Sequence, residues 1–368
     1  MNMTEPIKQS SGVKRTALIT GITGQDGILL GQNLLERGYR VVGFGRRESI
    51  IMRVDLRDLL ERIELSFGDM SDPFDIADVI QHVQPDEIYN LASQSDVSSS
   101  WSRAIETGDV TGLGAHRIFE AVRRFSPGSR VYHASSSEMF GEVRESPQNE
   151  STPFCPTSPY GAAKVYAHQL AAIYRRSFGL YVSCGILFNH ESPYRGRRFL
   201  TQKVAHGAAC AALGIQDSPE LNEQGEPMVR EGKLTLGNLG ARRDWGAARD
   251  YVGAMWAMLQ LDQGDDFVVG TGMLRTVEEL CETAYRHVGV DWTRHVRTDE
   301  RFLRPWETTA TVADATKARR VLGWSPRTGF KEMLGEMVDA QINRLRGSDG
   351  IAPIRVRPLQ IPGSNIRT

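Results

Sequence analysis

The sequence contains no apolar run that approaches the roughly 18 residues needed by a membrane-spanning helix. Its first stretch, MNMTEPIKQSSGVKR, also lacks the apolar core of a secretory signal. The formal net charge is −1, from 44 Lys and Arg against 45 Asp and Glu, so it gives no bulk attraction to nucleic acid or to an anionic membrane. We therefore expect neither a membrane nor a nucleic-acid partner.

Cysteine is scarce and is not arranged for metal binding. The four cysteines, Cys155, Cys184, Cys210 and Cys281, are scattered and form no C-x-x-C pair. This pattern predicts reduced thiols in a cytoplasmic protein, and no metal site.

What is present is the balance of a globular protein with a sizeable core. Of the 368 residues, 40 % are hydrophobic and 24 % are charged. This length predicts two domains, or one large domain with a substrate-binding lobe.

Short apolar runs alternate with amphipathic helical patterns through the first half of the chain. Strands are expected at 16–20, 40–45, 63–67, 86–92, 129–136 and 181–188. Helices are expected at 28–38, 72–83 and 160–179, with a long helical stretch between the fourth and fifth strands. This alternation predicts a parallel sheet that is covered on both faces.

After Asn189 the alternation weakens, which indicates a second, smaller unit. Helices are expected at 195–213 and 276–289, and a polar surface loop at 214–232. We predict an α/β fold: a Rossmann-type doubly wound parallel sheet with a smaller C-terminal α/β substrate-binding lobe. The expected ranges are 13–189 with a returning segment at about 242–272 for the sheet domain, 190–241 and 273–345 for the lobe, and 1–12 and 347–368 for flexible tails.

Glycines mark the turn after the first strand. Gly21, Gly24 and Gly27 stand three residues apart in TGITGQDGILL, directly before a helix. Such glycines let the backbone approach a pyrophosphate at a helix N-terminus. The alternative is a glycine-rich turn that binds no ligand.

The end of the second strand bears on the choice of dinucleotide. Arg46 and Arg47 stand where an NAD-binding protein commonly has an acidic residue. Guanidinium groups suit a 2′-phosphate, which favours NADP, although two solvated surface arginines are the simpler alternative. Asp69, at the end of the third strand, could accept from the adenine amino group or cap the following helix.

A Tyr–Lys pair follows a serine-rich strand end. Ser136 and Glu138 lie in ASSSEMFG, and Tyr160 and Lys164 lie in SPYGAAKVY. Residues four apart share one face of a helix, and an ammonium beside a phenol lowers the pKa of the phenol. Tyr160 could then act as a general base that removes a hydroxyl proton while a hydride leaves the same carbon. Alone, the pair could equally be part of the exposed stripe of an ordinary helix.

Together these segments resemble the extended short-chain dehydrogenase/reductases and, within them, the GDP-mannose 4,6-dehydratase family. The resemblance rests on ALITGITGQDG, GRR, EIYNLASQSDV, ASSSEMFG, SPYGAAKVYAH, FNHESPYRG, LGNLGARRDWGAARDYVGAMW and RPWE, and it extends from about residue 16 to about residue 340. ALITGITGQDG and SPYGAAKVYAH occur across the wider superfamily, whereas NHESP and GNLGARRDWG point to the GDP-mannose branch.

The resemblance implies an internal redox cycle with NADP. C4 of the sugar is oxidised, Glu138 removes the C5 proton, water leaves from C6, and hydride returns to C6. The implied catalytic residues are Ser136, Glu138, Tyr160 and Lys164. The implied cofactor contacts are Gly21, Gly24, Gln25, Asp26, Gly27, Arg46, Arg47, Asp69, Met70, Leu91, Ala92, Ser93, Gln94, Ser95, Tyr160, Lys164, His190 and Arg195. The implied substrate contacts are Ser136, Glu138, Asn189, Lys203, Arg243, Arg304 and Glu307.

The sequence departs from the family pattern in three places. The segment after Arg47 looks shorter than in the family and has a different sequence. In family members this segment reaches a neighbouring subunit of a tetramer, so its change favours a homodimer and leaves a homotetramer as the alternative. Residues 215–232 look like an insertion, which could reshape the pocket for GDP-manno-heptose or be surface decoration. Asp96 and Glu106 replace residues that are usual in the family.

Two other activities remain alternatives at this point. A nucleotide-sugar 4-epimerase would need the Tyr–Lys pair but would have no use for Glu138. A catalytically silent cofactor-binding scaffold would need neither.

Overall fold

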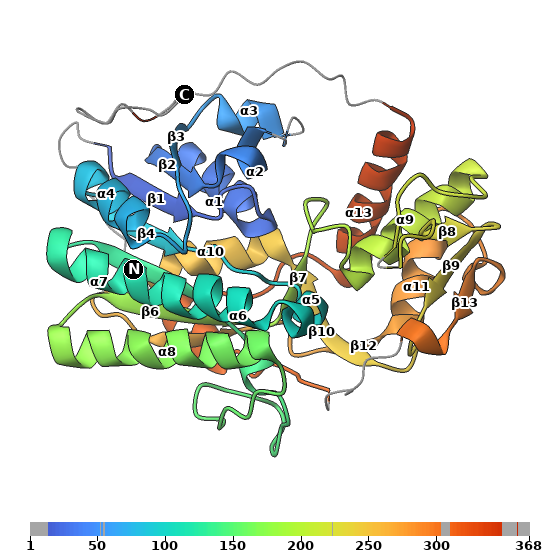
Figure 1. Cartoon of the computed structure of the whole chain (residues 1–368). Helices are drawn as coiled ribbons and strands as arrows, with labels where there is room; N and C mark the ends of the chain where they lie inside the picture. Colours follow the sequence, from blue (N-terminus) through green and yellow to red (C-terminus); the bar gives the residue numbers. More distant parts are fainter. Residues whose placement is uncertain are drawn as a thin grey trace, which may run out of the picture.

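The computed structural model describes residues 14–51, 53, 56–222, 224–302, 310–347 and 359. A seven-stranded sheet in the order β11-β6-β5-β4-β1-β2-β3 forms its larger part, and every neighbouring pair in it is parallel. Helices cover both faces of the sheet, and a smaller lobe lies beside it (Figure 1). The predicted fold class is therefore confirmed.

The strands of this sheet follow the apolar runs of the sequence closely. The predicted strands at 16–20 and 40–45 agree with β1 and β2 to the residue, and the others differ by one or two residues at an end. The seven strands are β1 Thr16–Thr20, β2 Arg40–Gly45, β3 Glu64–Phe67, β4 Glu87–Asn90, β5 Arg130–Ser136, β6 Val182–Leu187 and β11 Asp266–Val269.

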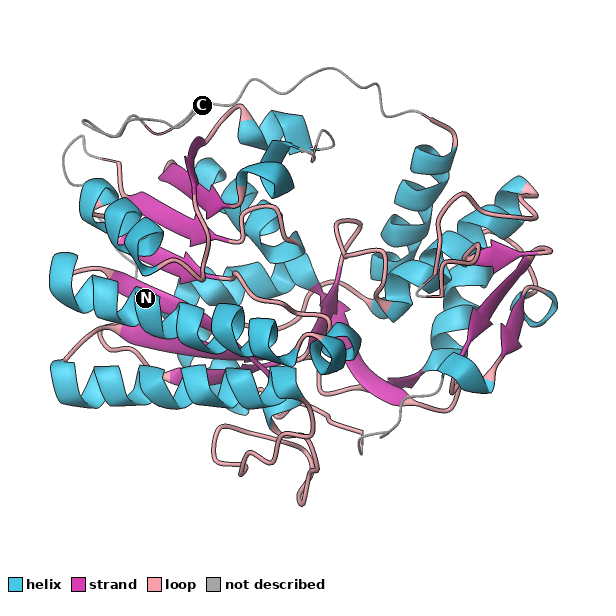
Figure 2. Ribbon diagram, viewed as in Figure 1, coloured by secondary structure: helices cyan, strands magenta, loops and turns pink. Residues whose placement is uncertain are grey.

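Two helical layers bury the two faces of the sheet (Figure 2). Successive residues of a strand point to opposite faces, so Ala17 and Ile19 pack against one layer while Leu18 packs against the other. The first layer holds α1 Gln25–Glu36 and α10 Ala248–Met258, with α3 Arg57–Leu60 and α12 Thr316–Leu322 beside them. The second layer holds α4 Pro73–Val83, α7 Gly114–Phe125 and α8 Pro159–Phe178.

The helix that carries the Tyr–Lys pair has clear signals at both ends. The Ser158 side chain accepts a hydrogen bond from the Gly161 amide, and Pro159 occupies the first turn. Gly179 ends α8 in the left-handed conformation, with φ of 67°. These signals explain why α8 lies within one residue of its predicted bounds.

The long helical stretch before β5 is broken into several pieces. It consists of α5 Val97–Ser102, α6 Ala104–Thr107, a π-helical turn η2 Gly108–Leu113, and then α7. Asp96 accepts a hydrogen bond from the Ser98 amide and so caps α5. Glu106 forms an ion pair with Arg103. Both unusual residues therefore have local structural partners.

The smaller lobe has its own apolar core and two three-stranded sheets. The helix expected from 195 begins five residues later, at Leu200, because residues 196–199 form a turn. Its helices are α9 Leu200–Leu213, α11 Val277–His287 and α13 Phe330–Leu345, and its strands are β7 Asn189–Glu191, β8 Val229–Arg230, β9 Lys233–Leu236, β10 Arg242–Ala247, β12 Leu274–Thr276 and β13 Val296–Thr298. The remaining short elements are α2 Arg47–Ile51, η3 Ser137–Met139, η4 Trp292–Arg294 and η5 Glu300–Phe302.

Residues 214–222 and 224–232 contain more regular structure than the expected surface loop. Leu221 bridges Pro227, and β8 pairs with β9 in an antiparallel hairpin. The Glu220 carboxylate binds Arg344 of α13 at 3.0 Å and lies 3.3 Å from Nε2 of the buried His206 of α9. The insertion is thus anchored in the lobe.

The four cysteines are free thiols, and three of them are buried. One group that could hold a metal, His168, Cys184 and Asp266, occurs among the described residues. Arg175 already donates to both carboxylate oxygens of Asp266, at 2.9 and 3.0 Å. Within the described part of the chain, no helix is long and apolar enough to span a membrane. The predicted tails lie outside the described residues, apart from Gly347 and Leu359.

The fully buried Asp244 of β10 provides a test of how the two units are joined. Its carboxylate accepts hydrogen bonds from the amides of Thr271, Gly272 and Ala313. We expect Asp244→Ala to lower the free energy of unfolding by about 3 kcal/mol, because buried amides lose their acceptor. Thermal unfolding checks this, and Asp58→Ala at an exposed site is the control. Equal melting temperatures for the two variants would contradict this role.

Candidate active site

A cavity of about 1450 Å³ lies where the carboxyl ends of the parallel strands face the smaller lobe. Ligands bind at this edge in doubly wound folds. The cavity brings together nearly all the predicted site residues. Those that line it are Gly21, Gly24, Gln25, Asp26, Gly27, Arg46, Asp69, Met70, Leu91, Ala92, Ser93, Gln94, Ser95, Ser136, Glu138, Tyr160, Lys164, Asn189, His190, Arg195, Lys203 and Arg243.

The glycine loop is shaped so that backbone atoms approach closely. Gly21 has φ of 72°, and a Cβ there would lie 2.9 Å from the Ala92 amide nitrogen. A Cβ on Gly27 would lie 2.4 Å from the Gly21 carbonyl oxygen. The loop turns directly into α1, whose first amides are free of helical partners and suit a phosphate. The residues present therefore fit a dinucleotide.

The two arginines after β2 differ in their surroundings. Arg46 lines the cavity, whereas the Arg47 guanidinium lies over the Phe67 ring, 5.6 Å from its centroid. Arg53, which was not predicted, donates to the Thr23 carbonyl of the glycine loop at 2.7 Å. Arg46 is thus the better placed of the predicted pair for a ligand phosphate.

One of our two hypotheses was that Asp69 caps the helix that follows it, and this hypothesis is wrong. Asp72 caps α4, because its carboxylate accepts from the Phe74 amide. Asp69 instead accepts from the amide and hydroxyl of Ser71. The hydrogen bond from the Ser71 backbone amide is the main cause that lowers the pKa of Asp69. Asp69 is therefore an ionised acceptor on the cavity wall.

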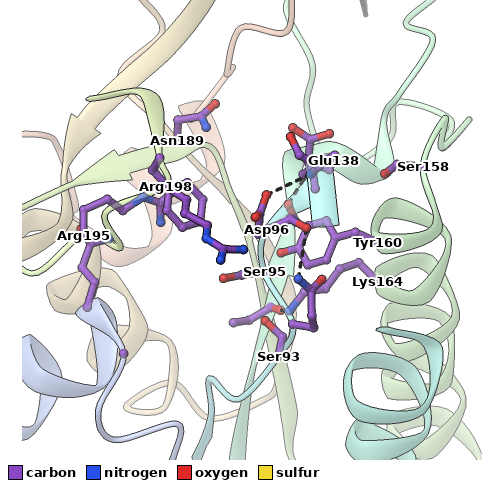
Figure 3. Close-up of a pocket in the computed structure, with 18 of the residues that line it drawn as sticks. Ser93, Ser95, Asp96, Glu138, Ser158, Tyr160, Lys164, Asn189, Arg195 and Arg198 are labelled. Carbon is purple, nitrogen blue, oxygen red and sulfur yellow. Dashed lines mark hydrogen bonds between the residues drawn. The ribbon is translucent and has the colours of Figure 1, made fainter. Parts of the chain in front are cut away.

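The predicted catalytic residues come from three neighbouring elements, β5, η3 and α8. Ser136 ends β5, and its hydroxyl accepts from the Glu138 amide at 3.2 Å. Tyr160 and Lys164 lie one turn apart on α8 and are both buried. Figure 3 shows Glu138, Tyr160 and Lys164 on one wall, facing Asn189, Arg195 and Arg198 across the cavity. A sugar ring held between the two walls would contact residues of both.

The pKa of Tyr160 does not follow the expectation from the Tyr–Lys spacing. Burial raises it to about 12, although a hydrogen bond from Ser136 acts to lower it. Lys164 donates to the Ala134 carbonyl at 2.7 Å, and burial lowers its pKa to about 8. Burial disfavours the charged form of each group, so the phenol is neutral at pH 7 in the ligand-free site.

The substrate wall contains residues that the sequence did not single out. Arg198, Gln224, Asn238 and Arg301 line the cavity beside the predicted contacts. Gln224 lies in the segment that looks like an insertion, and Asn238 lies in LGNLGARRDWG, so both had a usable signal. Arg198 and Arg301 stand in no motif that we recognised. The predicted contacts Arg304 and Glu307 lie outside the described residues.

Known proteins similar to this chain were found by sequence and by structure. A family model described as GDP-mannose 4,6 dehydratase matches residues 18–337. GDP-mannose 4,6 dehydratase 1 of Arabidopsis thaliana is 42 % identical over 341 residues, covering 89 % of this chain and 90 % of that protein. GDP-mannose 4,6 dehydratase of Homo sapiens is 40 % identical over 360 residues, covering 90 % and 93 %.

Solved structures share the fold at much lower identity. RMD from Pseudomonas aeruginosa, solved in complex with NADPH, superposes with a TM-score of 0.73 at 20 % identity. The match covers 90 % of this chain and all of that one. At this identity the likeness bears on the fold alone.

The close approach at Gly27 gives a test of the loop. We expect Gly27→Ala to weaken NADPH binding at least tenfold, because the added methyl must displace the Gly21 carbonyl. NADPH fluorescence titration measures this. Gly253→Ala is the control, because Gly253 also lies in a helix and an added Cβ there would have no neighbour within 4 Å. Unchanged NADPH affinity in Gly27→Ala would mean that the loop does not bind the dinucleotide.

Proposed function

The chain belongs to the GDP-mannose 4,6-dehydratase family, and from this premise we propose that it converts GDP-mannose to GDP-4-keto-6-deoxymannose with NADP as its cofactor. The observation that carries the proposal is the placement of Glu138 on the same wall as Tyr160, beside a glycine loop suited to a dinucleotide. A 4-epimerase would need the Tyr–Lys pair but no second acid–base group. The named relatives act on GDP-mannose by name, which favours this hexose over a heptose with one more carbon.

The cofactor, when bound, supplies the acceptor for the C4 hydride and the donor for the C6 hydride. Tyr160 accepts the proton of the C4 hydroxyl, and Ser136 stabilises the phenolate by the hydrogen bond that lowers the Tyr160 pKa. The ketone at C4 makes the C5 proton acidic. The Glu138 carboxylate removes that proton and passes it to the C6 hydroxyl, which leaves as water. C5 is reprotonated when hydride is added at C6, and this proton balances the one that Tyr160 took from the C4 hydroxyl.

Positive charge on the wall opposite Tyr160 can stabilise the diphosphate of the substrate and the Tyr160 phenolate. Arg243 and Lys203 line the lobe side of the cavity, where a nucleoside diphosphate would lie. The charge of Arg195 acts to lower the pKa of Tyr160. Arg195 is itself held by Glu191, with 3.1 Å between Nε and the carboxylate. The site thus offers fixed cations at both ends of the substrate.

We also propose that the protein is a cytoplasmic homodimer. Its free thiols suit a reducing compartment. Tyr166 and Ile173 are seven residues apart on the outer face of α8, and they are 41 % and 48 % exposed. Leu113 and Ile105, on the preceding helical turns, are exposed as well. A patch of apolar side chains of this kind marks an interaction site, and a second copy of the same face would cover it.

Glu138 is the residue that distinguishes dehydration from simple oxidation. We expect Glu138→Gln to lower dehydratase activity by about 10²–10⁴-fold while NADPH binding stays unchanged. Formation of the 4-keto-6-deoxy product, followed by chromatography, measures this. Glu142→Gln, an exposed acid four residues on, is the control, and Tyr160→Phe should lose the oxidation itself. Full dehydratase activity in Glu138→Gln would refute the assigned role.

The proposed dimer predicts the effect of a charge on the outer face of α8. Ile173→Arg should convert the dimer to a monomer, because burying an unpaired guanidinium costs several kcal/mol. Sedimentation velocity measures the mass. Val321→Arg, at an exposed apolar position on α12, is the control and should remain a dimer. An unchanged mass for Ile173→Arg would place the subunit contact elsewhere.

A further inference from the structure

The side chains of Gln25 and Asp26, at the start of α1, are bonded to strand β7 of the other wall. The Gln25 amide nitrogen donates to the His190 carbonyl at 2.9 Å, and its oxygen accepts from the Ser192 hydroxyl at 2.8 Å. One carboxylate oxygen of Asp26 lies 2.9 Å from Nε2 of His190. The resemblance to the family had suggested Gln25, Asp26 and His190 as cofactor contacts. Their polar atoms are already used within the protein.

The hydrogen bonds of His190 define its charge. Its Nδ1 lies 2.7 Å from the Phe188 carbonyl oxygen, which can only accept, so Nδ1 carries a hydrogen. Its Nε2 faces a carboxylate, so it carries a hydrogen as well. The ring also stacks on Tyr251, with 4.7 Å between centroids. The pair is therefore an imidazolium and a carboxylate in a fixed orientation.

Strand β7 carries the substrate wall. Asn189 is its first residue and lines the cavity, and Glu191 is its last. Glu191 accepts from the Thr201 hydroxyl at 2.6 Å and holds Arg195. On its other side β7 pairs with β10. The distance between the glycine loop and Asn189 therefore depends on the bonds made by Gln25 and Asp26.

We propose that Gln25 and Asp26 are positioning residues that hold β7 against the glycine loop, so that Asn189 and Arg195 stay opposite Tyr160 and Glu138. The backbone of the loop remains available to the dinucleotide, while these two side chains serve the substrate wall. Their loss then raises the KM for the sugar nucleotide and leaves NADPH affinity nearly unchanged. The assignment of Asn189 and Arg195 to the sugar nucleotide rests on the proposed function.

The pair has a definite pH dependence. Burial acts to raise the pKa of Asp26, but the charge and hydrogen bond of His190 outweigh it and leave the pKa lowered. Burial acts to lower the pKa of His190, but Asp26 outweighs it and leaves the pKa raised above the ordinary 6.5. The stabilisation is thus fully present between the ordinary pKa values of the two groups, 3.8 and 6.5. It is lost as pH rises through the raised pKa of His190, and as pH falls through the lowered pKa of Asp26.

The other charged and titratable groups around the pair do not reverse this sign. Arg195 acts to lower the pKa of both partners, and Asp26 acts to raise the pKa of Lys164, so removal of Asp26 also destabilises protonated Lys164. Asp26 acts to raise the pKa values of Tyr132 and Tyr160. Burial raises the pKa of Tyr251 well above 10, so the ring that stacks on His190 stays neutral.

The test compares Asp26→Ala and Asp26→Asn with the wild type, and Glu36→Gln, an exposed acid on the same helix, is the control. We expect Asp26→Ala to raise the KM for GDP-mannose about tenfold, as for a lost charge-assisted hydrogen bond. Its NADPH affinity, from fluorescence titration, should stay within about twofold. Asn can donate to neutral His190 or accept from the imidazolium, so Asp26→Asn should recover most of the loss and flatten the KM between pH 6 and pH 9.

Weakened NADPH binding with an unchanged KM would overturn the proposal and make Asp26 a cofactor contact. Thermal unfolding without ligand tests the pair independently of the reaction. The excess stability of wild type over Asp26→Asn should shrink between pH 6 and pH 9, and a constant excess would also overturn the proposal. If the shrinkage is observed but the wild type binds no GDP in calorimetry, the positioning pair stands and the proposed function fails.

Discussion

The site depends on the parallel alignment of β1, β4, β5 and β6, whose carboxyl ends all lie at one edge of the sheet. Thr20 pairs with Asn90, so β1 and β4 end level. Asn90 pairs with His133, and β5 continues three residues further, to Ser136, where it pairs with the last residue of β6. The Thr20 hydroxyl also accepts from the amides of Leu91 and Ala92. These bonds fix the segment after β4 against the glycine loop. A parallel sheet thereby gathers residues that are far apart in sequence into one cavity.

Burial within that cavity determines which groups carry charge. Tyr160 and Lys164 are both enclosed, and each is pushed towards its neutral form. Asp26 and His190 are also enclosed, but the charge of each stabilises the charged form of the other, so both stay ionised. The protein therefore keeps Asp26 and His190 charged as a pair, while burial keeps the Tyr160 phenol neutral at pH 7. Ser136 and Arg195 act to lower the pKa of Tyr160, which is the direction that proton abstraction requires.

Local signals made much of this architecture predictable. The strands and α8 follow from apolar runs, from a serine cap and from a glycine end, which all act within a few residues. The direction of the Gln25 side chain could not be predicted, because its partner His190 is 165 residues away. The anchoring of Glu220 was missed for the same reason, since Arg344 lies 124 residues on. Long-range polar contacts leave no periodic pattern in a sequence.

The reaction proposed for this site is an internal hydride cycle between C4 and C6 of a GDP-sugar. Incubation of the wild-type protein with NADP and GDP-mannose that carries deuterium at C4, followed by NMR of the product, tests this cycle. We expect a 4-keto-6-deoxy product with deuterium at C6. Deuterium that remains at C4 in an epimerised sugar, or a product without the label at C6, would contradict it.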